Sequence, residues 1–303
     1  EVSYAFNGNS TYQDLDMRSD GRLFAVRSVP GAAQTGFLVE LNTGDGTELS
    51  ANSDAIADVD ADGATQRFQS NNSASTALAY RRSDIATYDV VFYATADNDD
   101  YPGGNGVSKL YRGETGAGSA AWVANSFGAS GIITDAGGTI TTSTTGLQML
   151  GNTLWGVSAG NQLYRVSQQN SIAADGGTNV GNPDPANPAL NAALTPRLVN
   201  GTVFNYDLAT ILGADFTAGE AFSGITDAPR NVEGGRYANF LFLITNRGHI
   251  LCVDPNAVDE ATSIQTIFDS DNDNVLETYL TTNINNPTGL AFSPVDFNLW
   301  HPP

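Results

Sequence analysis

The residues GNTLWGVSAGNQLYRVS (151–167) contain the strongest structural signal in this chain, and ANFLFLITNRGHILCVD (238–254) repeats it. Each stretch is an apolar run with an aromatic residue, a short polar turn, and a second apolar run. Short apolar runs separated by turns rich in Gly and Asn are typical of two strands in a hairpin. The same pattern, with longer turns, occurs at 21–42 and 88–113. The chain is therefore expected to be all-β and built from repeated hairpins.

A further apolar segment precedes each hairpin, and a fourth segment follows it, as at 262–268. Glycines in the later preceding segments, as in TTGLQML, FSGITDA and PTGLAFS, suit close-packed inner strands. Four strands per unit, repeated about five times, predict one β-propeller domain over residues 1–303, with loop insertions such as 170–200. A tandem β-sandwich is the alternative, since alternating strands alone do not exclude it. The equivalent aromatics are Phe24, Phe92, Trp155, Phe242 and Trp300.

The repeat resembles the broad propeller families with G-x-L-[FWY] and G-x-L-Y-x-[VL] motifs. The last stretch, NNPTGLAFSPVDFNLWHPP (285–303), resembles repeats of very large secreted surface proteins of planctomycete-type bacteria. That resemblance implies an extracellular or cell-surface location. Because the chain ends one and a half strands into its fifth unit, we expect either that its N-terminal segment completes this unit or that the chain is a fragment of a larger protein. We also expect residues 2–6 to pair with strands around 290–300, because an open ring would expose two sheet edges.

The composition excludes two classes of partner. Acidic residues outnumber Lys and Arg by 33 to 13, which gives a formal charge of −20. Nucleic acid needs a basic surface, so it is not an expected partner. No apolar run approaches the 18 residues of a transmembrane helix, so membrane insertion is not expected either. Cys252 is the only cysteine, so it forms no intrachain disulfide and is expected to be a small buried residue.

The stretch DSDNDNVLE (269–277) resembles the calcium loops of integrin-type and related bacterial propeller repeats. The resemblance implies Ca²⁺ ligands at Asp269, Asp271, Asp273, the Val275 carbonyl and Glu277. Ca²⁺ takes six to eight oxygens, and alternating carboxylates in a tight loop supply several of them. Asn274 replaces the usual glycine, which is acceptable because Asn tolerates a positive φ. A solvated acidic turn is the alternative.

A second copy of this loop is DVDADGATQ (58–66). Its ligands would be Asp58, Asp60, Asp62 and the neutral oxygen of Gln66. With one charge fewer, this loop is expected to hold calcium more weakly.

No convergent catalytic set is visible in the sequence. Ser158 lies in a G-x-S-x-G match, but we expect a hairpin turn there instead of the strand-to-helix elbow of a nucleophile. His249 is expected to be structural or exposed. The favoured function is therefore a non-enzymatic binding or scaffold module whose partner is a protein, a second copy or a surface glycan. The alternative is a propeller hydrolase of lactonase or glycosidase type, with Asp16, Asp227 and Asp296 at the central channel.

Overall fold

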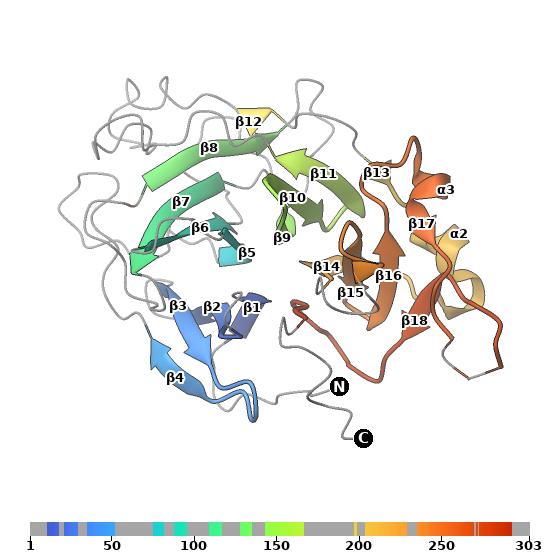
Figure 1. Cartoon of the computed structure of the whole chain (residues 1–303), viewed down its shortest axis with the longest axis horizontal. Helices are drawn as coiled ribbons and strands as arrows, with labels where there is room; N and C mark the ends of the chain where they lie inside the picture. Colours follow the sequence, from blue (N-terminus) through green and yellow to red (C-terminus); the bar gives the residue numbers. More distant parts are fainter. Residues whose placement is uncertain are drawn as a thin grey trace.

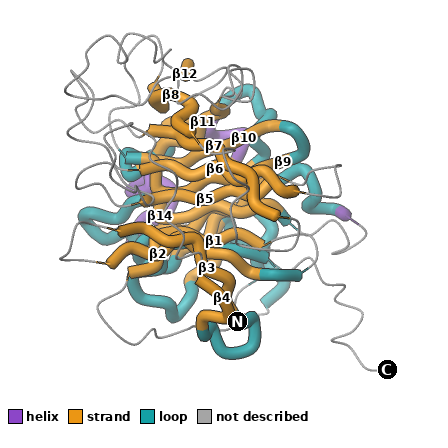
Figure 2. Tube along the Cα trace, turned by 90° about the vertical axis from the view of Figure 1, so that its left-hand side faces the viewer, coloured by secondary structure: helices purple, strands orange, loops and turns teal. Residues whose placement is uncertain are grey.

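The computed structural model describes residues 11–17, 21–29, 35–51, 75–81, 88–95, 109–116, 128–134, 143–166, 197–198, 204–228, 235–269, 271 and 273–292. Their sheets stand around a common axis, and the first strand of each sheet lies nearest to it (Figure 1). Figure 2 shows the strands from the side. The chain is an all-β protein with the architecture of a β-propeller, as its repeats predict.

The first two sheets follow the order of the chain from the axis outward. The first contains β1 (Thr11–Met17), β2 (Leu23–Val29), β3 (Thr35–Leu41) and β4 (Glu48–Ala51). The second contains β5 (Ser75–Arg81), β6 (Tyr88–Thr95), β7 (Lys109–Gly116) and β8 (Gly128–Thr134), with β12 (Arg197–Leu198) parallel to β8.

The next two sheets repeat this plan with shorter outer strands. The third contains β9 (Thr144–Leu150), β10 (Thr153–Ser158), β11 (Gln162–Val166) and β13 (Phe204–Asn205). The fourth contains β14 (Phe222–Asp227), β15 (Leu241–Thr245), β16 (His249–Val253) and β17 (Ile264–Gln265), and β18 (Tyr279–Thr281) also pairs with β16.

Short helices stand between these outer strands, and they shorten one predicted strand. They are α2 (Leu208–Leu212), the 3₁₀ turn η2 (Gly213–Asp215) and α3 (Glu260–Ser263). Residues 262–268 were expected to form a whole fourth strand, but only β17 is a strand there, and Phe268 forms an isolated bridge with Glu277. The reason is a helix cap: the Asp259 carboxylate accepts the Thr262 N–H at 2.8 Å, which favours a helical turn before the strand.

The strand registers confirm the repeat that the aromatic residues predict. In each sheet the aromatic of the second strand stands opposite the same position of the innermost strand. The four pairs are Phe24 with Asp16, Phe92 with Ala79, Trp155 with Gln148, and Phe242 with Thr226.

The ring is closed by residues 287–292, which occupy the place of a fifth innermost strand. The Thr145 hydroxyl donates to the Phe222 carbonyl at 2.8 Å, joining the third unit to the fourth. The Thr288 hydroxyl makes the equivalent bond to the Tyr12 carbonyl at 2.6 Å and joins the fifth unit to the first. The expected pairing of 2–6 with 290–300 lies mostly outside the described residues.

The core follows from this closure, because each sheet packs its faces against both neighbours. β15 and β16 are buried along their whole length, as expected for strands covered on both sides. Leu290 and Phe292 pack against one face of the fourth sheet, while Ala291 packs against the first sheet. Among the described residues, no helix is long and apolar enough to cross a membrane.

Candidate functional site

The innermost strands meet in a layer of small residues with a single carboxylate. A Cβ on Gly224 would lie 2.7 Å from the Gly289 Cα, and one on Gly289 would lie 2.9 Å from the Asp14 Oδ1. A side chain larger than hydrogen therefore does not fit at either glycine. The residues of this layer are Asp14, Ala77, Gly146, Gly224 and Gly289.

Asp14 uses the space that these small residues leave. Its side chain is 1 % exposed. Its carboxylate accepts N–H bonds from Leu15 at 2.9 Å, Leu78 at 2.8 Å and Leu147 at 3.3 Å, which come from β1, β5 and β9. An innermost strand has no sheet partner on its axial edge, so its N–H groups need another acceptor. Burial raises the pKa of Asp14 well above its ordinary value, although these bonds act in the opposite direction.

Asp16, two residues along the same face of β1, repeats this role one layer away. It is 3 % exposed and accepts N–H bonds from Met17 at 2.8 Å and Tyr80 at 2.7 Å. Burial raises the pKa of Asp16 to about 8, and repulsion from Asp227 adds to the rise, while the N–H bonds and the Gln148 amide oppose it.

Gln148 connects Asp16 to Asp227. It is 4 % exposed, and its Nε2 donates to the Asp227 Oδ1 at 3.2 Å and to the Met149 carbonyl at 3.3 Å. The Gln148 Oε1 is buried and has no hydrogen-bond partner among the described residues. We call Asp14, Asp16, Gln148 and Asp227 the central cluster.

The central cluster contains two of the three carboxylates predicted for a hydrolase. Asp16 and Asp227 lie close enough to interact, whereas Asp296 lies outside the described residues. Asp14 and Gln148 were not singled out by the sequence. The signal for Asp14 was its place in YQDLDM, where the alternation of a strand puts it on the same face as Asp16.

The predicted calcium loop lies at the periphery of the fourth unit. Asp269, Asp271 and Asp273 are exposed, and each offers a carboxylate oxygen within 4.8 Å of the others. Asn274 has φ 63°, so it adopts the positive φ that Asn was expected to tolerate at this position. Glu277 is not part of this group; its backbone forms a bridge with Phe268.

Within the loop, two carboxylates also order the backbone. The Asp271 Oδ1 accepts the Asp273 N–H at 3.2 Å, and the Asp273 Oδ1 accepts the Val275 N–H at 2.7 Å. The loop is therefore shaped by its own acids, and the three aspartates are the residues that could hold an ion. The second predicted loop, 58–66, lies outside the described residues.

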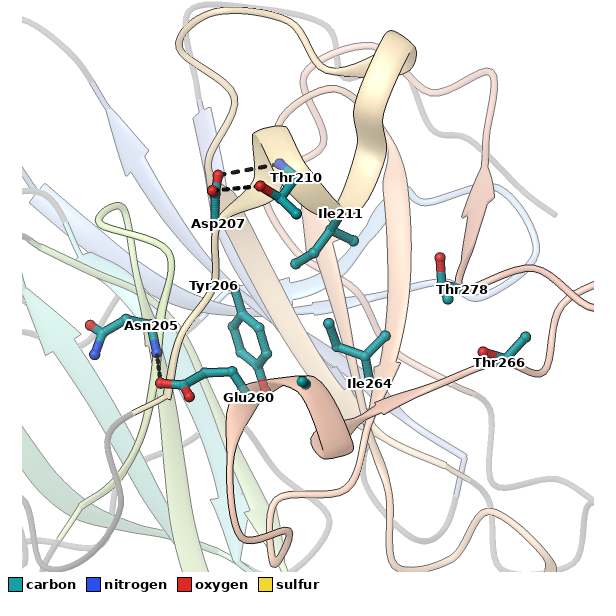
Figure 3. A pocket seen from close by; sticks show the side chains of 10 residues that line it. Asn205, Tyr206, Asp207, Thr210, Ile211, Glu260, Ile264, Thr266 and Thr278 are labelled. Atoms are coloured by element: carbon teal, nitrogen blue, oxygen red, sulfur yellow. Dashed lines mark hydrogen bonds between the residues drawn. The ribbon is translucent and has the colours of Figure 1, made fainter.

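A groove of about 690 Å³ lies on the rim between the third and fourth units (Figure 3). Ile211 of α2 and Ile264 of β17 are its half-buried aliphatic residues, and the Tyr206 ring lies beside them. Glu260 is fixed at one side, where its Oε1 accepts the Asn205 N–H at 3.1 Å. The lining residues are Asn205, Tyr206, Asp207, Thr210, Ile211, Glu260, Ala261, Ile264, Thr266 and Thr278.

The sequence did not reveal this groove, although it contained part of the signal. The run DLAT (207–210) has an N-cap residue before a helical start. The Asp207 carboxylate accepts N–H bonds from Ala209 at 3.1 Å and Thr210 at 3.3 Å. The hydrogen bond from the Thr210 hydroxyl has the largest effect, and together with these N–H bonds it lowers the pKa of Asp207. Asp207 therefore stays charged at the groove.

The other residues that the sequence flagged have structural partners. Ser158 ends β10, is buried, and accepts the Gly160 N–H at 3.2 Å in the hairpin turn that the sequence predicts. His249 is buried, with its Nδ1 2.6 Å from the Glu220 Oε1. Cys252 is buried, as expected, and burial raises the pKa of its thiol to about 12.

No family model and no curated protein matches the chain. Solved structures of similar fold include Sqt1 from Chaetomium thermophilum, with 10% identity, a TM-score of 0.37, and coverage of 95% of this chain and 65% of that one. BBS1N in complex with ARL6DN matches with 9% identity, a TM-score of 0.37, and coverage of 98% and 64%. The chain thus spans just under two thirds of these two proteins. A likeness this distant carries no argument about function, and the fold assignment rests on the sheets themselves.

Proposed function

We propose that this chain is a non-enzymatic propeller module that binds a protein partner in the rim groove, through a basic segment with an aliphatic anchor. The observation that carries the proposal is the groove itself, which combines apolar and acidic groups in one hollow. Recognition sites usually pair an apolar floor with a few fixed polar groups.

The apolar part of the groove suits one inserted aliphatic side chain. Ile211 and Ile264 come from different elements, and both are partly buried against the core beneath. An aliphatic residue placed between them would bury apolar area that the free protein leaves exposed, and such burial favours association.

The acidic part of the groove determines the sign of the charge that the partner carries. Asp207 and Glu260 both hold backbone N–H groups, so their carboxylates are already oriented before a ligand arrives. Oriented carboxylates favour Lys or Arg at little cost in side-chain entropy. The formal charge of −20 also steers a basic partner toward the surface.

The central cluster supports a binding function over a hydrolase. Asp14 and Asp16 are almost fully buried, and both accept N–H bonds from neighbouring strands. These hydrogen bonds between units give the two acids a structural role, because they stabilise the ring. A general acid must instead reach the substrate atom that it protonates.

Calcium at Asp269, Asp271 and Asp273 and an extracellular location are part of the same proposal. The three exposed carboxylates converge, and Ca²⁺ is a hard cation that prefers such oxygens. Extracellular calcium modules bind with dissociation constants of about 10⁻⁴ to 10⁻³ M. An exposed loop with three carboxylates therefore suits a compartment rich in calcium.

The groove is tested with a labelled short peptide that alternates Lys and Leu, using fluorescence anisotropy at low salt. We expect Glu260→Gln, which keeps the acceptor for Asn205, to weaken binding roughly two- to fivefold, the range of one exposed ion pair. Thr266→Lys, which places a like charge in the groove, should weaken it by about tenfold or more.

Two controls make this test specific. Leu49 lies on β4 of the first sheet, and its side chain is 59% exposed. The substitution Leu49→Lys should therefore leave the affinity for the peptide unchanged. A peptide that alternates Glu and Leu should not bind. Equal affinity of the Lys peptide for all three variants and the wild type would remove the groove from the proposal.

A further inference from the structure

The rim groove has α2 and α3 on opposite sides, and these two walls are held at different depths (Figure 3). On the α3 side, the hydroxyls of Tyr206 and Ser263 lie 2.9 Å apart, and both residues are buried. On the α2 side the contact lies at the surface, where the Tyr279 hydroxyl donates to the Asp215 Oδ2 at 2.7 Å. Water competes for an exposed hydrogen bond, so the α2 wall is the one that a single substitution can loosen.

The Tyr279 contact joins positions of the chain that stand directly beside two residues of the groove. Tyr279 begins β18 and follows Thr278, which lines the groove. Asp215 ends the η2 turn that continues α2. The Tyr279 hydroxyl also lies 3.4 Å from the carbonyl of Leu212, the residue that follows Ile211. One side chain therefore links the chain at Thr278 to the helix that carries Ile211.

The Tyr279 ring is itself fixed from the side of the core. It packs against the buried core cluster beneath the groove. The His249 ring meets it edge to face, with the ring centroids 5.6 Å apart and the planes at 84°. His249 is buried in turn, and its Nδ1 lies 2.6 Å from the Glu220 Oε1. Edge-to-face packing favours one arrangement of the rings, so the Tyr279 hydroxyl is aimed at Asp215 before a ligand arrives.

We propose that Tyr279 is a positioning residue of the rim groove, because its bond to Asp215 fixes the α2 wall where that wall receives the aliphatic anchor of the partner. The inference rests on the proposed function of the groove. A wall that is fixed in advance costs less free energy to order when a ligand binds. Without the bond the wall occupies other positions, and the affinity falls with the fraction of protein that is competent to bind.

Amide hydrogen exchange tests the position of the wall without any ligand. The Ile211 N–H is bonded to the Asp207 carbonyl at 3.0 Å inside α2. Tyr279→Phe removes only the hydroxyl, and we expect exchange at Ile211 to become roughly two- to tenfold faster, the factor that one hydrogen bond supplies. The amides of β2 and β3, in the first sheet, should exchange at unchanged rates.

Peptide affinity tests whether the wall matters for binding. The anisotropy assay with the Lys and Leu peptide compares Asp215→Asn with Asp215→Ala. Both substitutions remove the same carboxyl group, but only Asn keeps an oxygen that accepts the Tyr279 hydroxyl. We expect Asp215→Ala to bind roughly two- to tenfold more weakly than Asp215→Asn, and this difference to vanish when Tyr279 is replaced by Phe. A general loss of stability would not depend on Tyr279 in this way, and circular dichroism confirms that each variant is folded.

The matched control is Tyr12→Phe, because the Tyr12 hydroxyl also donates to a carboxylate, that of Glu48 in the first sheet. This variant should bind like the wild type. Equal affinities of the two Asp215 variants, or unchanged exchange at Ile211 in Tyr279→Phe, would overturn the positioning role. If the wild type itself binds no peptide, the proposed function fails, and the exchange rates alone decide whether Tyr279 fixes the wall.

Discussion

The centre and the rim of this propeller use the same residue type for opposite purposes. At the centre, Asp14 and Asp16 alternate along β1 and are 1 % and 3 % exposed. At the rim, Asp269, Asp271 and Asp273 alternate along a loop and are exposed. Burial raises the pKa of both central acids. Spacing alone therefore does not distinguish a structural carboxylate from one that is available to a ligand.

The physical difference lies in what each carboxylate bonds. Asp14 accepts N–H groups from residues 64 and 133 positions away, and so joins separate units. Asp271 accepts the N–H of Asp273, two residues away, and shapes only its own turn. Loss of the first kind of contact affects the whole ring, whereas loss of the second affects one loop.

The largest expected effect is that of Asp14→Ala. It leaves buried N–H groups of β1, β5 and β9 without an acceptor, at about 1–3 kcal/mol each. We expect the free energy of unfolding, measured by urea denaturation, to fall by about 3 kcal/mol or more. Asp14→Asn keeps one acceptor oxygen and should lose less. Asp271→Ala in a chelator is the matched rim variant and should change stability by only about 0.5 kcal/mol. Similar losses for the two alanine variants would contradict the comparison.

The next largest effect is a dependence of stability on pH. In the native state burial raises the pKa of Asp16 from 3.8 to about 8. Below about pH 4 both the folded and unfolded chains are protonated at this residue. As the pH rises toward 8, the unfolded chain ionises first, so the free energy of unfolding falls by up to ~1.4 kcal/mol per pH unit. Above the native pKa this contribution is lost.

Asp16→Asn is the variant that isolates this effect. It cannot ionise, so its stability should depend less steeply on pH between 4 and 8, and it should be the more stable protein at the upper end. Urea denaturation in a chelator measures both proteins. Parallel pH profiles would show that Asp16 titrates normally.

A smaller effect is expected from calcium at the rim. An ion that binds only the native state, at about 100 times its dissociation constant, adds roughly 2.7 kcal/mol. The midpoint of thermal unfolding of the wild type should be higher in calcium than in EGTA. Magnesium should substitute poorly, because it requires a tight octahedral coordination shell. Asp271→Asn should lose most of that rise. Identical wild-type melts in EGTA and calcium would make 269–277 a solvated turn.

The sequence was sufficient for the architecture because the relevant signals are local. A hairpin such as 151–167 needs only two apolar runs and a turn, and Asn161 at φ 60° supplies that turn. The aromatic of each second strand then sets the alignment of the units. The short helix α3 was missed because one cap, Asp259, outweighed the strand character of the residues that follow.

The central cluster could be predicted only in part, for the opposite reason. Asp16 and Asp227 were recognised as acids near inner strands, but their environment depends on residues far away in the chain. Gln148 gave no signal of its own, since its role comes from Asp227, 79 positions later. The groove likewise requires α2 and α3 to meet in space, and no local pattern encodes that meeting.

The central claim is that the centre supports the ring while the rim binds a partner. The most direct measurement is the affinity for the Lys and Leu peptide, determined side by side for Asp16→Asn and Glu260→Gln. Each variant exchanges a carboxyl group for an amide and keeps an oxygen acceptor in place. The account predicts that Asp16→Asn binds like the wild type and that Glu260→Gln binds roughly two- to fivefold more weakly. Weaker binding by Asp16→Asn with normal binding by Glu260→Gln would contradict it.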